Sequence, residues 1–74
     1  EVVMSIYPNP AVDYVQVRSK NVLKVNIYNL EGAEVRTGFT NEKIYLNNVE
    51  SGVYLIITTD EKGLSRTNKL IIRD

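Results

Sequence analysis

The clearest structural signal in the chain is the stretch Leu23-Lys24-Val25-Asn26-Ile27-Tyr28, residues 23–28. Three aliphatic residues alternate here with residues of the opposite face, which is the period of a β-strand with one buried and one wet face. Shorter stretches of the same alternation occupy residues 14–18 and 43–46. No segment carries apolar residues at helical spacing over three turns, so the pattern predicts strands and no substantial helix.

Turn signals divide the rest of the chain into further short strands. A first strand, residues 2–7, is expected to stop at Pro8-Asn9-Pro10, because two prolines cannot continue a ladder. Asn29-Leu30-Glu31-Gly32 and Asp60-Glu61-Lys62-Gly63 are typical of tight turns. The remaining strands are expected near residues 34–36, ending at Gly38, and at residues 53–59 and 64–72. The strand at 53–59 starts apolar on both faces, as a central strand does.

These elements predict an all-β fold, an immunoglobulin-like β-sandwich of about seven short antiparallel strands. A five-stranded barrel is the alternative. The 74 residues suffice for one domain and not for two, so residues 1–74 are expected to form a single domain. Because the chain has no cysteine, the fold must rest on apolar packing and sheet hydrogen bonds alone.

Composition excludes several classes of function. Nine basic and nine acidic residues cancel, which argues against binding to nucleic acid. The longest wholly apolar run, Val53-Tyr54-Leu55-Ile56-Ile57, is far shorter than the ~20 residues of a membrane-spanning helix, so no transmembrane segment is expected. No signal peptide opens the chain, so an export signal would belong to a longer precursor.

The sequence also gives no support for a catalytic site. Without histidine or cysteine, the commonest general base, the usual zinc ligands and the thiol nucleophile are missing. Ser19-Lys20 cannot act as a dyad on an extended strand, because neighbours point to opposite faces. The carboxylates are scattered, and no glycine-rich phosphate loop occurs. We therefore expect no catalytic residue, no metal site, no cofactor and no enzymatic activity.

Four motifs follow one another to the end of the chain: Tyr7-Pro8-Asn9-Pro10; Val25-Asn26-Ile27-Tyr28-Asn29 with Leu30-Glu31-Gly32 and Val35; Leu46 and Val49 with Gly52-Val53-Tyr54-Leu55; and Lys69-Leu70-Ile71-Ile72-Arg73. Each motif alone is weak, but the ordered set covers essentially the whole chain. In this the chain resembles the C-terminal sorting domain of the type IX (Por) secretion system of Bacteroidetes. It departs from the family's usual ending at Arg73, where a final Lys is more common, and at the trailing Asp74.

The resemblance implies a C-terminal sorting signal with a seven-stranded sandwich fold and no catalytic role. The implied partners are the outer-membrane type IX translocon, a cell-surface sortase and an upstream cargo protein in the same precursor. The implied route runs through the periplasm to the surface or the extracellular space of a Gram-negative bacterium. The alternative is an immunoglobulin-like accessory domain that binds carbohydrate or spaces catalytic domains. Position discriminates the two, because a sorting domain must end its precursor.

The motif residues have expected structural roles. The prolines of Pro8-Asn9-Pro10 fix two φ angles and remove two donors, which should stiffen the exit from the first strand. Gly32 and Gly52 are expected where a side chain would clash. Tyr54, near a strand start, is expected to hydrogen-bond to upstream backbone, as the tyrosine corner of immunoglobulin-like sandwiches does.

Candidates for partner recognition are the basic residues near the chain end. Lys69 and Arg73 flank Leu70-Ile71-Ile72, which has the composition of a core strand. Long basic side chains keep their charged ends in water and can select a partner, whereas buried residues cannot be read without unfolding.

Three tyrosines are further candidates. Tyr14, Tyr28 and Tyr45 are each expected to face outward, because their strand neighbours face the core. On one sheet they would form an amphipathic platform for a protein partner, or they could stack on sugar rings. On different sheets they would be isolated surface residues.

Overall fold

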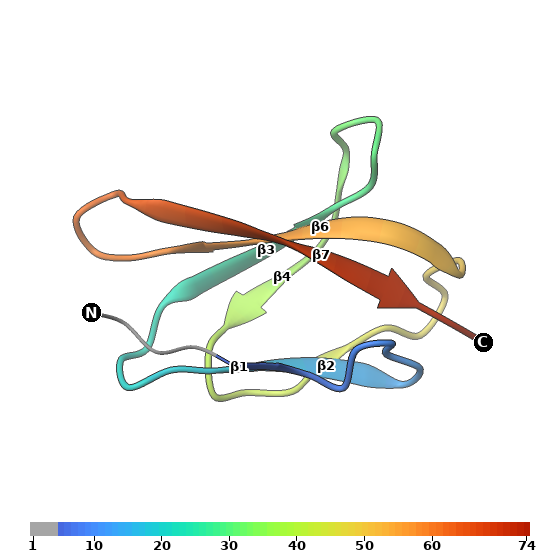
Figure 1. Cartoon of the computed structure of the whole chain (residues 1–74), viewed down its shortest axis with the longest axis horizontal. Helices are drawn as coiled ribbons and strands as arrows, with labels where there is room; N and C mark the ends of the chain where they lie inside the picture. The colour runs from blue at the N-terminus through green and yellow to red at the C-terminus, as the bar shows by residue number, and fades with distance from the viewer. Residues whose placement is uncertain (1–4) are drawn as a thin grey trace.

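The computed structural model describes residues 5–74, which form two antiparallel sheets (Figure 1). One sheet has the order β1-β2-β5 and consists of β1 (Ser5–Tyr7), β2 (Tyr14–Arg18) and β5 (Ile44–Tyr45). The other has the order β4-β3-β6-β7 and consists of β3 (Lys24–Tyr28), β4 (Glu34–Phe39), β6 (Gly52–Thr59) and β7 (Ser65–Ile72). The predicted strand at residues 2–4 lies outside the described residues.

The two sheets pack face to face around one apolar core. Alternate residues of β2, β3, β6 and β7 point inward, Ala11 and Leu46 join them from outside the strands, and Ile6 of β1 and Val35 of β4 pack against them. The buried core consists of Ala11, Val15, Val17, Val25, Ile27, Ile44, Leu46, Tyr54, Ile56, Leu70 and Ile72. The predicted sandwich is therefore confirmed. The barrel is wrong, since no strand of one sheet pairs with a strand of the other. Residues 5–74 contain no helix, and so none long and apolar enough to cross a membrane.

The strand order departs from the constant-type immunoglobulin fold at one strand. Lettered A to G along the chain, the sheets here are A-B-E and D-C-F-G. In constant-type domains strand D lies on the sheet of A, B and E. Here the turn after β3 spans only a few residues, and β4 stays paired with β3 from Lys24↔Phe39 to Tyr28↔Glu34. The short turn therefore keeps the fourth strand on the sheet of the third.

The two hairpins of the four-stranded sheet close with the same side-chain device. Asn29 Oδ1 accepts hydrogen bonds from the N–H groups two and four residues further along, at 3.0 and 2.9 Å. Asp60 Oδ1 does the same at 2.9 and 3.0 Å. An Asn or Asp side chain that mimics a backbone turn in this way is the reason both turns were predictable from composition.

The expected steric reason for two motif glycines is wrong. A Cβ at Gly32 would meet nothing within 4 Å, and one at Gly52 would lie an ordinary 3.8 Å from the Tyr54 ring. Both instead have φ angles, +93° and +155°, that side chains rarely adopt. The close approach is at Gly38, where a Cβ would lie 2.9 Å from Ile44 Cγ1 on the opposite sheet. The strand does not end at Gly38 but continues past it.

Tyr54 forms the expected corner. It is the third residue of β6, its ring is buried in the core, and its hydroxyl donates a 2.6 Å hydrogen bond to the carbonyl oxygen of Glu50. The bond fixes the path of the chain between β5 and β6, at the position where immunoglobulin-like sandwiches place their tyrosine corner.

Replacing Tyr54 by Phe should therefore destabilise the domain without disturbing its packing. The variant loses one partly buried hydrogen bond, and we expect the free energy of unfolding to fall by about 1–2 kcal/mol. Urea unfolding of the parent, Tyr54→Phe and Tyr28→Phe measures this, with Tyr28 as the matched control on the outer face of the same sheet. An equal loss in both variants would contradict a specific role for the Tyr54 hydroxyl.

Candidate functional site

The C-terminal strand β7 lies at the edge of the four-stranded sheet, where it presents one buried and one exposed face. Leu70 and Ile72 are buried in the core, whereas Lys69 and Arg73 are exposed. Ile71 is only half-buried, so its assignment to the core is wrong. The period of two in a strand turns Ile71 to the outer face, between the two basic residues.

The outer edge of β7 is covered by the side chain of Asn9. Its Nδ2 donates to the carbonyl oxygen of Lys69 at 3.2 Å, and its Oδ1 accepts from the N–H of Ile71 at 3.1 Å. A carboxamide has one acceptor and two donors, so it can bond the strand as a neighbouring peptide group would. The prolines on either side have no N–H and cannot supply these bonds.

Ala11 continues this contact with its backbone. Its N–H donates to Ile71 O at 2.8 Å, and its carbonyl accepts from Arg73 N at 2.7 Å, in a parallel bridge. Both X-Pro bonds in the segment, Tyr7-Pro8 and Asn9-Pro10, are cis. Residues 9–11 thus bind the chain's last strand, while residues 5–7, just before them, pair with β2 in the other sheet.

Around Ile71 the outer face of the sheet is aliphatic. The register places Val53 beside Ile71, and Leu55 between Tyr28 and Lys69. Val53 is 42% exposed, and Tyr28, Leu55 and Ile71 are half-buried. We call this surface the C-terminal face, and it consists of Tyr28, Val53, Leu55, Lys69, Ile71 and Arg73. Exposed apolar patches rimmed by charge mark interaction sites in soluble proteins.

The three predicted tyrosines do not form one platform. Tyr14 and Tyr45 pair across β2 and β5, with ring centroids 6.4 Å apart, and the Lys43 ammonium lies 4.6 Å from the Tyr14 centroid. Tyr28 lies on the other sheet, on the C-terminal face. The tyrosines are separated because their strands belong to different sheets, and local alternation does not encode which strands pair.

Tyr7, which was not among the three tyrosines predicted to face outward, shares the face of Tyr14 and Tyr45. Tyr7 pairs with Gln16, and Arg18 Nε donates a 3.4 Å hydrogen bond to its hydroxyl. The alternation of Ser5-Ile6-Tyr7, with Ile6 packed against the core, is the signal that could have found it.

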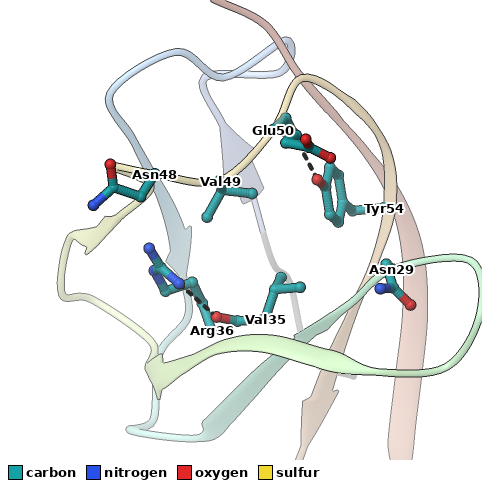
Figure 2. Close-up of a pocket in the computed structure, with 7 residues that line it drawn as sticks. All are labelled: Asn29, Val35, Arg36, Asn48, Val49, Glu50 and Tyr54. Atoms are coloured by element: carbon teal, nitrogen blue, oxygen red, sulfur yellow. Dashed lines mark hydrogen bonds between the residues drawn. The ribbon is translucent and has the colours of Figure 1, made fainter.

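An open cleft of 280 Å³ lies where the second and third motifs meet (Figure 2). Its lining residues are Asn29, Val35, Arg36, Asn48, Val49, Glu50 and Tyr54. The Arg36 guanidinium already donates to the carbonyl oxygens of Val35, Tyr45 and Asn47, and the Tyr54 hydroxyl donates to Glu50. These polar groups hold the surrounding loop in place, which is a structural use of the cleft.

No reactive constellation accompanies these surfaces. Within residues 5–74 no three acidic, histidine or cysteine side chains lie together as metal ligands. The serines and carboxylates have no histidine with which to form a catalytic pair, since the chain contains none. The arrangement of exposed side chains can bind and select a partner, and this defines the protein as a small β-sandwich recognition module.

Comparison with known proteins identifies the module. The chain belongs to the family described as the secretion system C-terminal sorting domain, whose model matches residues 5–73. It is also similar to beta-agarase D of Zobellia galactanivorans, with 25% identity over 72 residues, which cover 96% of this chain and 15% of that protein. No solved structure matches it significantly.

Membership of this family confirms the resemblance on which the function was predicted. The chain is a sorting-signal module of type IX secretion, recognised by that system and exported to the cell surface or the extracellular space. The family is not a catalytic one. The chain spans about a seventh of the relative's length.

Removing the Asn9 carboxamide should open one specific edge of the structure. In Asn9→Ala we expect a loss of about 1–3 kcal/mol in stability, because two backbone groups of β7 lose their partner. Hydrogen exchange should accelerate at the Ile71 amide far more than at the Leu70 and Ile72 amides, which face β6. Asn68→Ala, on the exposed part of the same strand, is the control. Uniform acceleration along β7 would contradict a local role for Asn9.

Proposed function

We propose that residues 1–74 act as a single, non-catalytic sorting domain whose C-terminal face is the surface that the outer-membrane type IX translocon reads. In this proposal a cargo domain precedes the chain in the same precursor. A cell-surface sortase acts on the precursor after it has crossed the outer membrane. Lys69 and Arg73 are the residues that carry recognition, and Ile71 is the apolar contact between them.

The single observation that carries the proposal is the division of β7 into two faces. Leu70 and Ile72 are buried, so a partner cannot reach them on the folded domain. The side chains of Lys69 and Arg73 are exposed, and that of Ile71 is half-buried. The backbone of these three residues is hydrogen-bonded to Asn9 and Ala11. A fixed backbone under exposed side chains presents them without the entropic cost of ordering a loose chain end.

The composition of this face suits a protein partner. An apolar centre with a charged rim is the usual anatomy of a protein interface. The two cations would supply selectivity and association rate, and the aliphatic residues would supply the buried area. Tyr28 lies beside Leu55 on this face and belongs to the proposed surface. Tyr14 and Tyr45 lie on the other sheet and fall outside it.

Family membership favours this function over that of an accessory or spacer domain. The match of the sorting-domain family covers residues 5–73, and so includes both the Asn9 segment and the C-terminal strand. These two parts are joined by hydrogen bonds in the structure. A spacer has no need for a presented basic pair at a defined strand.

Removing the basic pair should separate sorting from folding. In Lys69→Ala combined with Arg73→Ala, we expect Tm to stay within about 4 °C of the parent, because exposed charges contribute little to stability. Fused to an exported reporter in a type IX-competent cell, the variant should remain in the periplasm. Cell fractionation and thermal melts measure the two properties.

The matched control is Lys62→Ala combined with Arg66→Ala. It removes the same charge from the exposed β6–β7 turn and the start of β7, at the other end of that strand from Arg73. If both double variants sort normally, Lys69 and Arg73 are not read by the translocon. If both fail equally, overall charge and not this surface governs sorting.

The two faces of β7 should respond differently to alanine. Leu70→Ala removes a fully buried side chain and should cost about 2–5 kcal/mol of stability. Ile71→Ala should cost about 1 kcal/mol, since its half-buried side chain on the outer face buries less apolar area. We expect Tm of Ile71→Ala to fall by no more than about 8 °C and surface delivery of the reporter still to decrease. Full delivery of the Ile71 variant would remove this residue from the recognition surface.

A further inference from the structure

We propose that the outer face of the three-stranded sheet binds an extracellular polysaccharide that carries sulfate or carboxylate groups. We call this surface the tyrosine face, and it consists of Tyr7, Tyr14, Gln16, Arg18, Lys43 and Tyr45. It lies on the sheet opposite the C-terminal face, so this activity is additional to sorting and independent of it.

The register brings the three tyrosines onto one surface. Tyr14 pairs with Tyr45, and Gln16, two residues along the same strand face, pairs with Tyr7. The rings therefore occupy three neighbouring strands, which lie about 4.8 Å apart in such a sheet. Tyr45 is 59% exposed, and Tyr7 and Tyr14 are half-exposed with their backs supported by neighbours. The Tyr14 and Tyr45 rings are inclined at 56° to each other, so the tyrosines form an angled aromatic surface and not a flat platform.

The polar groups of the face are hydrogen-bond donors and cations. Arg18 donates from its Nε to the Tyr7 hydroxyl, and within residues 5–74 its two terminal nitrogens make no further hydrogen bond. The Lys43 ammonium lies over the face of the Tyr14 ring, 4.6 Å from its centroid, so a cation sits directly on this surface. β1, β2 and β5 contain no acidic residue, and the nearest carboxylates, Asp13 and Glu42, occupy the adjoining turns. The face is thus electrostatically suited to an anion.

Among the described residues, the outward strand positions of this face hold no aliphatic side chain, which favours a sugar over a protein partner. These positions hold Ser5, Tyr7, Tyr14, Gln16, Arg18 and Tyr45. The C-terminal face, by contrast, contains Val53, Leu55 and Ile71, the residues from which a protein interface builds its core. Aromatic rings stack on the C–H faces of pyranose rings, while amide and guanidinium groups bond their hydroxyl and acidic substituents. Tyrosine rings with Gln and Arg beside them combine these two kinds of contact.

The test uses the 74-residue chain and three probes of similar length: a dextran sulfate oligosaccharide, the neutral dextran oligosaccharide, and an oligoglutamate peptide. Titration followed by amide NMR should show binding of the sulfated sugar, with shifts at residues 7, 14–18 and 43–45. Tyr14→Ala and Tyr45→Ala should each weaken it about tenfold, the loss expected when one aromatic contact disappears. Tyr28→Ala, on the other sheet, should leave affinity unchanged. Thermal melts check that each variant remains folded.

Each other outcome overturns the proposal. If oligoglutamate binds as tightly as the sulfated sugar, the surface recognises negative charge alone or an acidic protein. Equal binding of neutral dextran would remove the acidic class of ligand. Shifts centred on residues 69–73, or an unchanged affinity in folded Tyr14→Ala and Tyr45→Ala, would remove the tyrosine face. Because the variants used to test sorting change no residue of the tyrosine face, failure here leaves the sorting function untouched.

Discussion

The structure depends on the pair of hydrogen bonds between the Asn9 carboxamide and the backbone of Lys69 and Ile71. The two sheets share no strand, and each alone would leave an apolar face in water. The chain crosses from β1 in one sheet to the edge of β7 in the other within residues 8–11. A proline-flanked asparagine suits this crossing, because the prolines limit the backbone while the side chain supplies the donor and acceptor that they lack. The first and last motifs are therefore one hydrogen-bonded unit, although they are 60 residues apart.

A second asparagine uses the same chemistry. Asn41 Oδ1 accepts from Ser19 N at 3.0 Å, and its Nδ2 donates to Ser19 O at 2.9 Å, from a backbone with φ of 68°. Thr40 beside it is buried and bonds both Leu23 N and Asn21 O through its hydroxyl. A chain of this length buries a smaller share of its surface than a larger domain and has few residues for long strands. Side-chain amides that make the hydrogen bonds of a peptide group extend the short β-ladders without adding residues to the strands.

The periodic strands were predictable from the sequence, and their arrangement across the sheets was not. Alternation located β3 to within one residue, and a run that starts apolar on both faces located β6 equally well. Turn composition located both hairpins, because these signals are local. The crowded glycine, Gly38, was missed because its neighbour Ile44 belongs to the other sheet. Whether Tyr14 and Tyr28 share a sheet could not be decided for the same reason, since it depends on which strands pair. Ile71 was misplaced although the period of two was visible, because three apolar residues in a row have the composition of a core strand. The hydrogen bonds between Asn9 and β7 could not be predicted, because no local sequence pattern signals them.

A signal that is read on a folded domain must consist of residues that folding arranges but does not bury. On β7, Leu70 and Ile72 anchor the strand in the core, and the pleat turns Ile71 to the opposite side from them. The unfolded chain carries the same basic residues, but it does not place Ile71 beside Val53, which only the β6–β7 register does. A partner that contacts the basic pair and the aliphatic residues together therefore gains affinity only from the folded form. On the proposed recognition surface, burial of Leu70 and Ile72 with exposure of their neighbours would make correct folding a condition of recognition.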